Sequence, residues 1–365
     1  MSDVKWMVRA LVVVCALLVA QGTGSSANLS PAADQTPAAS TVEGGATLRF
    51  VQSNGIRMRI AEMGTGPLVI LLHGFPESWY SWRHQLPALA KAGYHAVAPD
   101  LRGYGQSDKP KAVEAYDIHQ LTADVVGIID ALKEKTAIVI GHDWGSMVAW
   151  HCLLLHPTRF TALVPMSVPY SGRAATSPLD TMKKTYGDNF YYILYFQEPG
   201  VAEKEFDADP RGILSRLYLS PNSPRETPAV TDRKRAAGGW IPRMGAPKGL
   251  PDWITQKELD YYVQEFTASG FRGGINFYRN FHRNWERTPQ LTGATISQPV
   301  RFISGARDGV IRGASADQLT TSMSRVAKDL RGVVLVPEAG HWVQQEKPQE
   351  TNAAILEFLK GLPKR

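Results

Sequence analysis

The apolar positions of the chain gather in short runs separated by polar segments and by stretches with helical spacing. Runs without a polar face are typical of strands that are buried on both sides of a sheet. Such strands are predicted at 67–72, 94–99, 137–140, 161–166, 300–304 and 333–336. An earlier pair, 48–51 and 56–60, alternates around Asn54-Gly55 and predicts a hairpin. Because a helical stripe, 121–132, lies between two of the runs, we predict a mostly parallel sheet with helices on both faces.

This alternation of strands and helices stops in the middle of the chain. Residues 171–288 are rich in Tyr, Trp, Pro and Gly, and they contain helical patterns at 214–219 and 258–266. The strand pattern then resumes. We therefore predict a core formed by residues 47–170 and 289–365, with the segment 171–288 inserted as a mainly helical cap over the ligand-binding end of the sheet.

The N-terminal segment has a different pattern. In residues 1–27, two basic side chains precede an apolar run, 10–20, and small polar residues follow it. This order is typical of a secretory signal peptide, and the run is short for a membrane span. We expect an exported protein, periplasmic or secreted, cleaved after Ala20 or Ala27; the alternative is an uncleaved N-terminal anchor. Residues 28–46 lack periodicity and are predicted to form a disordered tether.

The composition excludes several classes of protein. With 44% hydrophobic and 20% charged residues, the chain is globular, and a net charge of +6 over 365 residues is mild. Basic clusters occur without an aromatic RNA-binding module or zinc-ligand spacing, so neither a nucleic-acid partner nor a metal is expected. Since Cys15 lies in the predicted signal peptide, Cys152 is the only cysteine of a mature chain and an intramolecular disulfide is excluded.

A sharp turn from strand to helix is predicted at residues 141–145, Gly-His-Asp-Trp-Gly. The β-branched run 137–140 precedes it, and an apolar helical segment that ends at Pro157 follows. This is the setting of a Gly-x-Ser-x-Gly nucleophile elbow, with Asp143 in place of the serine. Glycines suit such a turn because its strained backbone passes close to its neighbours. A carboxylate is ionised at neutral pH, so Asp143 can attack carbon without a base.

Two further candidate residues follow later strands. Asp308 comes after the strand 300–304, and His341 comes after the strand 333–336. The chain order nucleophile, acid, histidine matches the order of the α/β-hydrolase triad. Because carboxyl ends of parallel strands meet at one edge of the sheet, we expect Asp143, Asp308 and His341 to form a carboxylate–histidine–carboxylate triad.

An aspartate nucleophile predicts chemistry in two steps. Attack on an sp3 carbon forms an alkyl-enzyme ester, and His341, oriented by Asp308, then activates a water molecule that attacks the Asp143 carbonyl. The backbone N–H groups of Phe75 and Trp144 are the expected oxyanion-hole donors for the second step. A halide leaves unaided in the first step, whereas an epoxide oxygen needs a proton donor, which a tyrosine supplies. Spacing alone does not say which of the cap tyrosines point into the site.

At these positions the sequence resembles the α/β-hydrolase-fold epoxide hydrolases of the soluble type, from about residue 48 to 360. The resemblance is carried by the motifs at 73–76, 141–145, 192–200, 272–280, 308 and 340–342. It implies an α/β-hydrolase fold with a mostly parallel eight-stranded sheet, a vicinal diol as product, and no metal or organic cofactor. By this resemblance the nucleophile is Asp143 and the charge-relay pair is Asp308 and His341.

The same resemblance implies which cap tyrosines open the ring. These are Tyr192 and Tyr278, with Tyr191 and Tyr195 as competing choices for the first. Side chains expected to contact the substrate are Phe75, Trp144, Phe196 and Trp342. The expected partners are a small epoxide and water, with no stable membrane span in the mature chain and the oligomeric state left open.

Four alternative functions are weighed against this pattern. A haloalkane dehalogenase would use the same triad, with the Trp144 indole on the halide, but typical members carry Asn or Glu where this chain has Phe75. Fluoroacetate dehalogenases place Arg directly after the nucleophile, where this chain has Trp144. A serine esterase is disfavoured because no other Gly-x-Ser-x-Gly occurs. A non-catalytic binding protein of the same fold would be expected to lack one of the site residues, and all are present.

Overall fold

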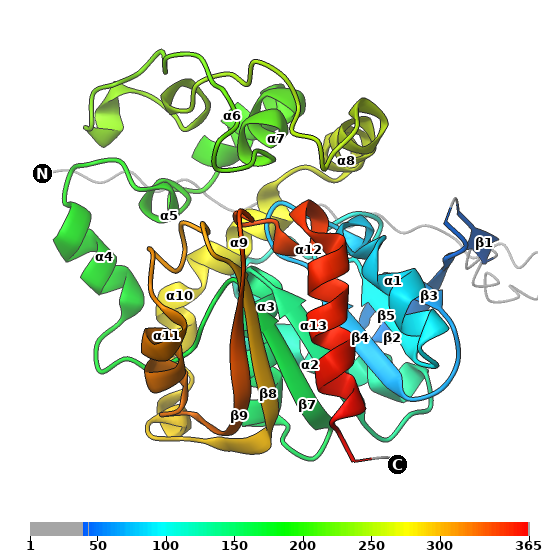
Figure 1. Ribbon diagram of the computed structural model, residues 1–365. Coiled ribbons are helices and arrows are strands. Elements are labelled where there is room, and N and C mark those ends of the chain that lie inside the picture. Colours follow the sequence, from blue (N-terminus) through cyan, green and yellow to red (C-terminus); the bar gives the residue numbers. More distant parts are fainter. Residues whose placement is uncertain (1–38, 43, 364–365) are drawn as a thin grey trace, which may run out of the picture. The chain divides into compact units, whose positions relative to one another are not determined.

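The fold is built on a mixed β-sheet (Figure 1). This computed structural model describes residues 39–42 and 44–363. Among these residues the sheet has nine strands in the order β1-β2-β3-β5-β4-β6-β7-β8-β9. Strands β4 to β9 run parallel, and β1 to β3 form an antiparallel edge. The strands are β1 (Ser40–Thr41), β2 (Thr47–Ser53), β3 (Ile56–Met63), β4 (Leu68–Leu72), β5 (His95–Pro99), β6 (Ala137–His142), β7 (Phe160–Met166), β8 (Ile296–Gly305) and β9 (Ala327–Val336).

All eight strands predicted from the sequence are present, and the ninth corrects the prediction. Strand β1 lies inside the stretch 28–46 that was predicted to be a disordered tether, and it pairs Ser40 with Leu48 of β2. Ala46, at the end of the same stretch, is buried. The ordered chain therefore begins before residue 47, while the predicted signal peptide, 1–27, lies outside the described residues.

The central strands are buried on both faces, as their continuous apolar runs predict. Along β4, Ile70 and Leu72 belong to one buried cluster, whereas Val69 and Leu71 belong to the other. Helices α2 and α3 contribute to the first cluster, and α1 and α13 contribute to the second. The helices of the core are α1 (Gln85–Lys91), α2 (Ile118–Ala131), α3 (Trp144–Leu155), α11 (Ala316–Met323), α12 (Val343–Glu346) and α13 (Pro348–Lys360), with short 3-10 turns η1 (Trp79–Trp82), η2 (Val113–Tyr116) and η5 (Pro289–Leu291).

A mainly helical segment is inserted between β7 and β8, as predicted. Figure 1 shows its helices α5 to α8 above the carboxyl ends of the parallel strands. They are α4 (Pro178–Tyr186), α5 (Tyr192–Tyr195), α6 (Val201–Ala208), α7 (Pro210–Leu217), α8 (Gln256–Ser269), α9 (Arg272–Arg279) and α10 (Phe281–Glu286), with 3-10 turns η3 (Arg235–Ala237) and η4 (Ile241–Arg243). Among the described residues no helix is both long and apolar enough to cross a bilayer.

Helix α8 ties the cap to the core through ion pairs at both of its ends. Near its start, Glu258 accepts a hydrogen bond of 2.7 Å from Nε of Arg83. Two turns later, Glu265 pairs with the buried Arg59, whose Nε also bonds Asp100 at 2.5 Å. Because Arg59 is shared between a core carboxylate and a cap carboxylate, it fixes this end of the cap over the sheet.

The turn after β6 has the backbone of a nucleophile elbow. The backbone of Asp143 has φ 52° and ψ −117°, a conformation that residues other than glycine rarely adopt. A methyl group on Gly141 would lie 2.1 Å from the Gly145 carbonyl oxygen, and one on Gly145 would lie 2.0 Å from that of Leu72. Both glycines are therefore required by close backbone approach, and the Asp143 side chain is left at the carboxyl end of β6.

Candidate active site

The Asp143 carboxylate is held by the loop that follows β4. Its Oδ1 accepts a hydrogen bond of 2.9 Å from the backbone N–H of Phe75. A methyl group on Gly74 would lie 2.4 Å from the Asp143 Cβ, so the loop reaches the carboxylate only because residue 74 is glycine. Trp144 begins α3, and its backbone N–H is one of the first-turn donors that no carbonyl of the helix can accept. Both predicted oxyanion-hole donors therefore lie beside the nucleophile.

His341 lies between the two carboxylates that the sequence analysis assigned to it. Its Nδ1 is 3.1 Å from both carboxylate oxygens of Asp308, and its Nε2 is 3.6 Å from Oδ2 of Asp143. The three residues follow β6, β8 and β9, whose carboxyl ends meet at one edge of the sheet. The structure thus brings the predicted triad together.

The charges of this triad shift the pKa values of its members. Burial alone would raise the pKa of Asp308, but the charge of His341 and its hydrogen bond outweigh burial and lower that pKa to about 2. Burial alone would likewise lower the pKa of His341, but Asp308 and Asp143 together raise it well above its usual value. The resting arrangement is an imidazolium between two carboxylates.

Two of the cap tyrosines named above pack against each other, within reach of the charge of the nucleophile. The rings of Tyr192 and Tyr278 are 5.7 Å apart, centroid to centroid. Burial and the Asp143 charge both raise the pKa of Tyr278, and burial, Tyr191 and the Asp143 charge raise that of Tyr192. Both hydroxyls therefore lie within the field of the nucleophile and stay protonated at neutral pH.

The competing tyrosines have other partners. The hydroxyl of Tyr195 donates to Oε2 of Glu205 at 2.9 Å. The ring of Tyr191 stacks on Tyr186, with centroids 4.0 Å apart and planes within 4°. Of the choices near the first position, Tyr192 is the one whose ring contacts Tyr278.

Most of the predicted substrate contacts surround Tyr278. The rings of Phe75, Trp144 and Phe196 lie 5.4, 5.1 and 5.0 Å from its ring centroid. Trp342 has a different place: its indole N–H donates to the Leu217 carbonyl at 2.9 Å, and its ring packs on His341. Trp342 therefore supports the histidine.

Trp240 was not singled out from the sequence. It stacks on Tyr192, with centroids 4.8 Å apart and an interplanar angle of 17°. It lies in a cap stretch with little regular structure, so no periodic pattern pointed to it.

A buried ion pair beneath the elbow was also missed. Oε2 of Glu77 accepts hydrogen bonds from the backbone N–H of Gly74 at 2.7 Å and from Nδ1 of His142 at 2.9 Å. The other nitrogen of His142, Nε2, donates to the carbonyl of His341 at 2.7 Å. Both ring nitrogens of His142 therefore face acceptors, one of them the Glu77 carboxylate.

This ion pair connects the three segments that build the site. Glu77 belongs to the Phe75 loop, His142 precedes the nucleophile, and the bond from His142 reaches the loop that carries His341. The other oxygen of Glu77 accepts from the side chains of Gln344 and Gln345 in α12. The sequence signal for this ion pair was the charged residue three positions after Gly74, within a buried motif. A glutamate at that position is equally consistent with an ordinary turn residue, so the signal alone did not indicate an ion pair.

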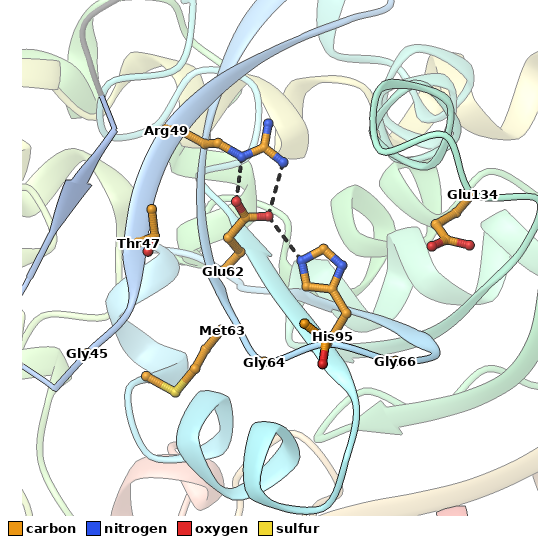
Figure 2. A pocket seen from close by; sticks show the side chains of 10 residues that line it. Gly45, Thr47, Arg49, Glu62, Met63, Gly64, Gly66, His95 and Glu134 are labelled. Carbon is orange, nitrogen blue, oxygen red and sulfur yellow. Dashed lines mark hydrogen bonds and ion pairs between the residues drawn. The ribbon is translucent and has the colours of Figure 1, made fainter.

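A separate cleft of about 560 Å³ lies elsewhere on the core (Figure 2). Figure 2 shows Arg49 and His95 both bonded to Glu62, at distances from 2.5 to 3.0 Å. His95 begins β5, so the cleft lies at the amino end of a strand, whereas Asp143 follows the carboxyl end of β6. It is lined by none of the predicted site residues; its lining is Gly45, Thr47, Arg49, Glu62, Met63, Gly64, Thr65, Gly66, His95 and Glu134.

Comparison with known proteins shows which families and proteins this chain resembles. Residues 67–348 match the family model described as alpha/beta hydrolase fold. The chain is 49% identical to epoxide hydrolase A of Mycobacterium tuberculosis, over 88% of this chain and 100% of that protein. It is 39% identical to epoxide hydrolase 1 of Siraitia grosvenorii, over 85% of this chain and 97% of that protein. The crystal structure of epoxide hydrolase A from Mycobacterium thermoresistibile superposes with a TM-score of 0.81 at 47% identity, covering 88% of this chain and all of that one.

The buried pair predicts a large effect of Glu77→Gln on stability. This substitution removes the carboxylate from the buried Glu77–His142 pair, so we expect the free energy of unfolding to fall by about 3–5 kcal/mol. Chemical denaturation at pH 7 measures it. Glu338→Gln, which removes an exposed ion pair with Arg307, is the matched control and should cost less than about 1 kcal/mol.

The effect of Glu77→Gln should also depend on pH. Burial would raise the pKa of Glu77, but the His142 charge and hydrogen bond lower it from 4.5 to about 2 on folding. The stabilisation is thus complete above pH 4.5 and is lost as the pH falls through about 2. Two results would contradict the role given to Glu77. One is a loss of unfolding free energy in Glu77→Gln that grows as the pH falls. The other is a loss at pH 7 no larger than that of Glu338→Gln.

Proposed function

The chain belongs to the α/β-hydrolase-fold epoxide hydrolases, and we propose that it converts its epoxide to a vicinal diol through an ester on Asp143. One observation carries this proposal. The Asp143 carboxylate accepts a hydrogen bond from the Phe75 N–H and faces His341, and its charge helps to keep two cap tyrosines, Tyr192 and Tyr278, protonated. Ring opening requires a nucleophile and a nearby proton donor, and these residues supply both.

In the first step an Asp143 oxygen attacks one epoxide carbon. The bond between that carbon and the ring oxygen breaks, and its electron pair stays on the oxygen. A tyrosine hydroxyl protonates this oxygen, because an unprotonated alkoxide is a poor leaving group. The product is a hydroxyalkyl ester of Asp143, with the negative charge now on a tyrosine oxygen.

Ester formation changes the state of His341. In the resting enzyme Asp308 and Asp143 both support its protonated form. Esterification removes the Asp143 charge, so the pKa of His341 falls when a base is needed. The proton that His341 releases balances the one that the tyrosine gave up. Neutral His341 then removes a proton from water, which attacks the Asp143 carbonyl beside the N–H groups of Phe75 and Trp144.

The function is tested by the products of the wild-type enzyme and of His341→Gln. Wild type should release a vicinal diol from a small aryl or aliphatic epoxide. His341→Gln should still form the ester but should hydrolyse it about 10²–10⁴-fold more slowly, since that step loses its base. Intact-mass analysis should therefore show one substrate added to each His341→Gln chain.

His95→Gln, in the cleft of Figure 2, is the control and should turn over at the wild-type rate without trapped ester. Halide release from a haloalkane without diol formation from any epoxide would instead assign a dehalogenase. Absence of added mass on His341→Gln would contradict the ester mechanism.

We also propose that the mature protein is exported. The support is the sequence of residues 1–27, in which basic residues precede the apolar run 10–20. Expression of the full chain in a bacterial host, followed by N-terminal sequencing of the periplasmic and secreted fractions, should give a start at Gln21 or Asn28. Recovery of the protein only with membranes and with residues 1–27 intact would support the anchored alternative.

A further inference from the structure

Tyr192 lies in a helix that needs support from outside. Helix α5 consists of the four residues Tyr192–Tyr195, and a single helical turn is not stable on its own. The ring of Tyr192 stacks on the indole of Trp240, with centroids 4.8 Å apart and planes at 17°. Its contacts with Phe196 and Tyr278 are edge to face, at 79° and 77°. The plane of the Trp240 indole therefore sets the plane of the Tyr192 ring.

The backbone of Trp240 is bound by a carboxylate on helix α6. Glu205 accepts hydrogen bonds from the N–H groups of Trp240 at 2.9 Å and of Ile241 at 3.0 Å, one on each carboxylate oxygen. A methyl group on Gly239 would lie 2.2 Å from Oε1 of Glu205, so the chain approaches this closely only because residue 239 is glycine. Since hydrogen bonds to a carboxylate are among the stronger ones, Trp240 is fixed to α6.

The same carboxylate also binds helix α5. The hydroxyl of Tyr195, at the end of α5, donates to Oε2 of Glu205 at 2.9 Å. Glu205 therefore binds both the helix that carries Tyr192 and the segment that carries its stacking partner, Trp240. One side chain thus holds the backbone and the ring neighbour of Tyr192 in register.

The loop before Trp240 is closed on itself by Arg243. The Arg243 guanidinium donates to three backbone carbonyls within residues 232–238 and lies 4.4 Å from the ring centroid of Phe190. The N–H of Phe190 in turn donates to the Arg233 carbonyl at 2.7 Å. The loop is therefore joined to the segment that directly precedes α5, and it carries Trp240 to the Tyr192 ring.

We propose that Trp240 and Glu205 are positioning residues for ring opening: Trp240 sets the ring plane of Tyr192, and Glu205 fixes Trp240 and α5 to each other. Neither residue transfers a proton. They hold the Tyr192 hydroxyl at the place where the epoxide oxygen leaves, because a misplaced catalytic group loses rate although its chemistry is intact. The assignment rests on the proposed function and extends it to two residues outside the triad and the tyrosine pair.

Single-turnover kinetics of Trp240→Ala test the assignment, with excess saturating enzyme, styrene oxide as the probe, and rapid quench to separate ester formation from ester hydrolysis. We expect ester formation to slow about 10- to 100-fold, because Tyr192 loses its stacking partner. Hydrolysis of the ester should change by less than about twofold, since it uses His341 and backbone donors. Trp240→Phe keeps a flat ring and should restore ester formation to within about threefold of wild type.

The two tyrosine backgrounds separate positioning from a general effect on the cap. In Tyr192→Phe, adding Trp240→Ala should cause no further loss, because the hydroxyl that Trp240 positions is already absent. In Tyr278→Phe, the full loss from Trp240→Ala should remain. Equal losses in both backgrounds, a slowing of ester hydrolysis as large as that of ester formation, or no recovery in Trp240→Phe would overturn the assignment.

Glu205→Gln tests the second residue. The amide replaces one carboxylate oxygen by an NH2 group that cannot accept, so at least one of the three hydrogen bonds is lost. We expect ester formation to slow about 3- to 10-fold, the range for one such bond, with no further loss in Tyr192→Phe. A wild-type rate of ester formation, or a loss that persists in Tyr192→Phe, would contradict the role of Glu205.

Trp285→Ala is the matched control. Trp285 is another half-buried cap tryptophan, whose ring lies 4.5 Å from the guanidinium carbon of Arg173 and whose indole N–H donates to the Ala174 carbonyl at 2.8 Å. Neither partner belongs to the site, so both rates should stay within about twofold of wild type. If wild type forms no ester from any small epoxide, the proposed function itself fails. If wild type forms the ester and Trp240→Ala forms it equally fast, only the roles given to Trp240 and Glu205 fail.

Discussion

The strained backbone at Asp143 is the constraint on which the rest of the site depends. A residue other than glycine at φ 52° and ψ −117° costs on the order of 1–3 kcal/mol. The cost is met by close packing, since Gly141 and Gly145 allow β6, α3 and the Leu72 carbonyl to approach. In return the carboxylate stands clear of the sheet with the Phe75 N–H on one oxygen and His341 near the other. Trp144 is placed by the same turn.

Charge connects the elbow to its neighbours. The buried pair of Glu77 and His142 connects the Phe75 loop and the loop of His341 to the elbow. Above it, the negative charge of Asp143 supports a protonated His341 and neutral tyrosines. When that charge is consumed by ester formation, His341 becomes a base and a phenolate becomes easier to form. One change of charge therefore separates the two chemical steps.

The sequence predicted those parts that depend on local pattern and on general topology. Continuous apolar runs identified six strands and an alternating pattern identified two more, and the convergence of parallel strand ends brought Asp143, Asp308 and His341 together. Strand β1 was missed because two polar residues carry no periodicity, and only pairing with β2 orders them. The orientation of tyrosine rings and the partners of Glu77 depend on packing between segments far apart in the chain. Spacing therefore could not separate Tyr192 from Tyr191, or reveal that Trp342 supports His341.

The central claim is that the Asp143 carboxylate is the nucleophile. A single turnover with excess enzyme and an epoxide in heavy-oxygen water, followed by peptide mass analysis, tests it most directly. Water attacks the carbonyl of the ester, so the account predicts heavy oxygen in the Asp143 carboxylate and a diol whose oxygens are both ordinary. Heavy oxygen in the diol after that first turnover, with none in Asp143, would show direct attack of water on the epoxide and contradict the account.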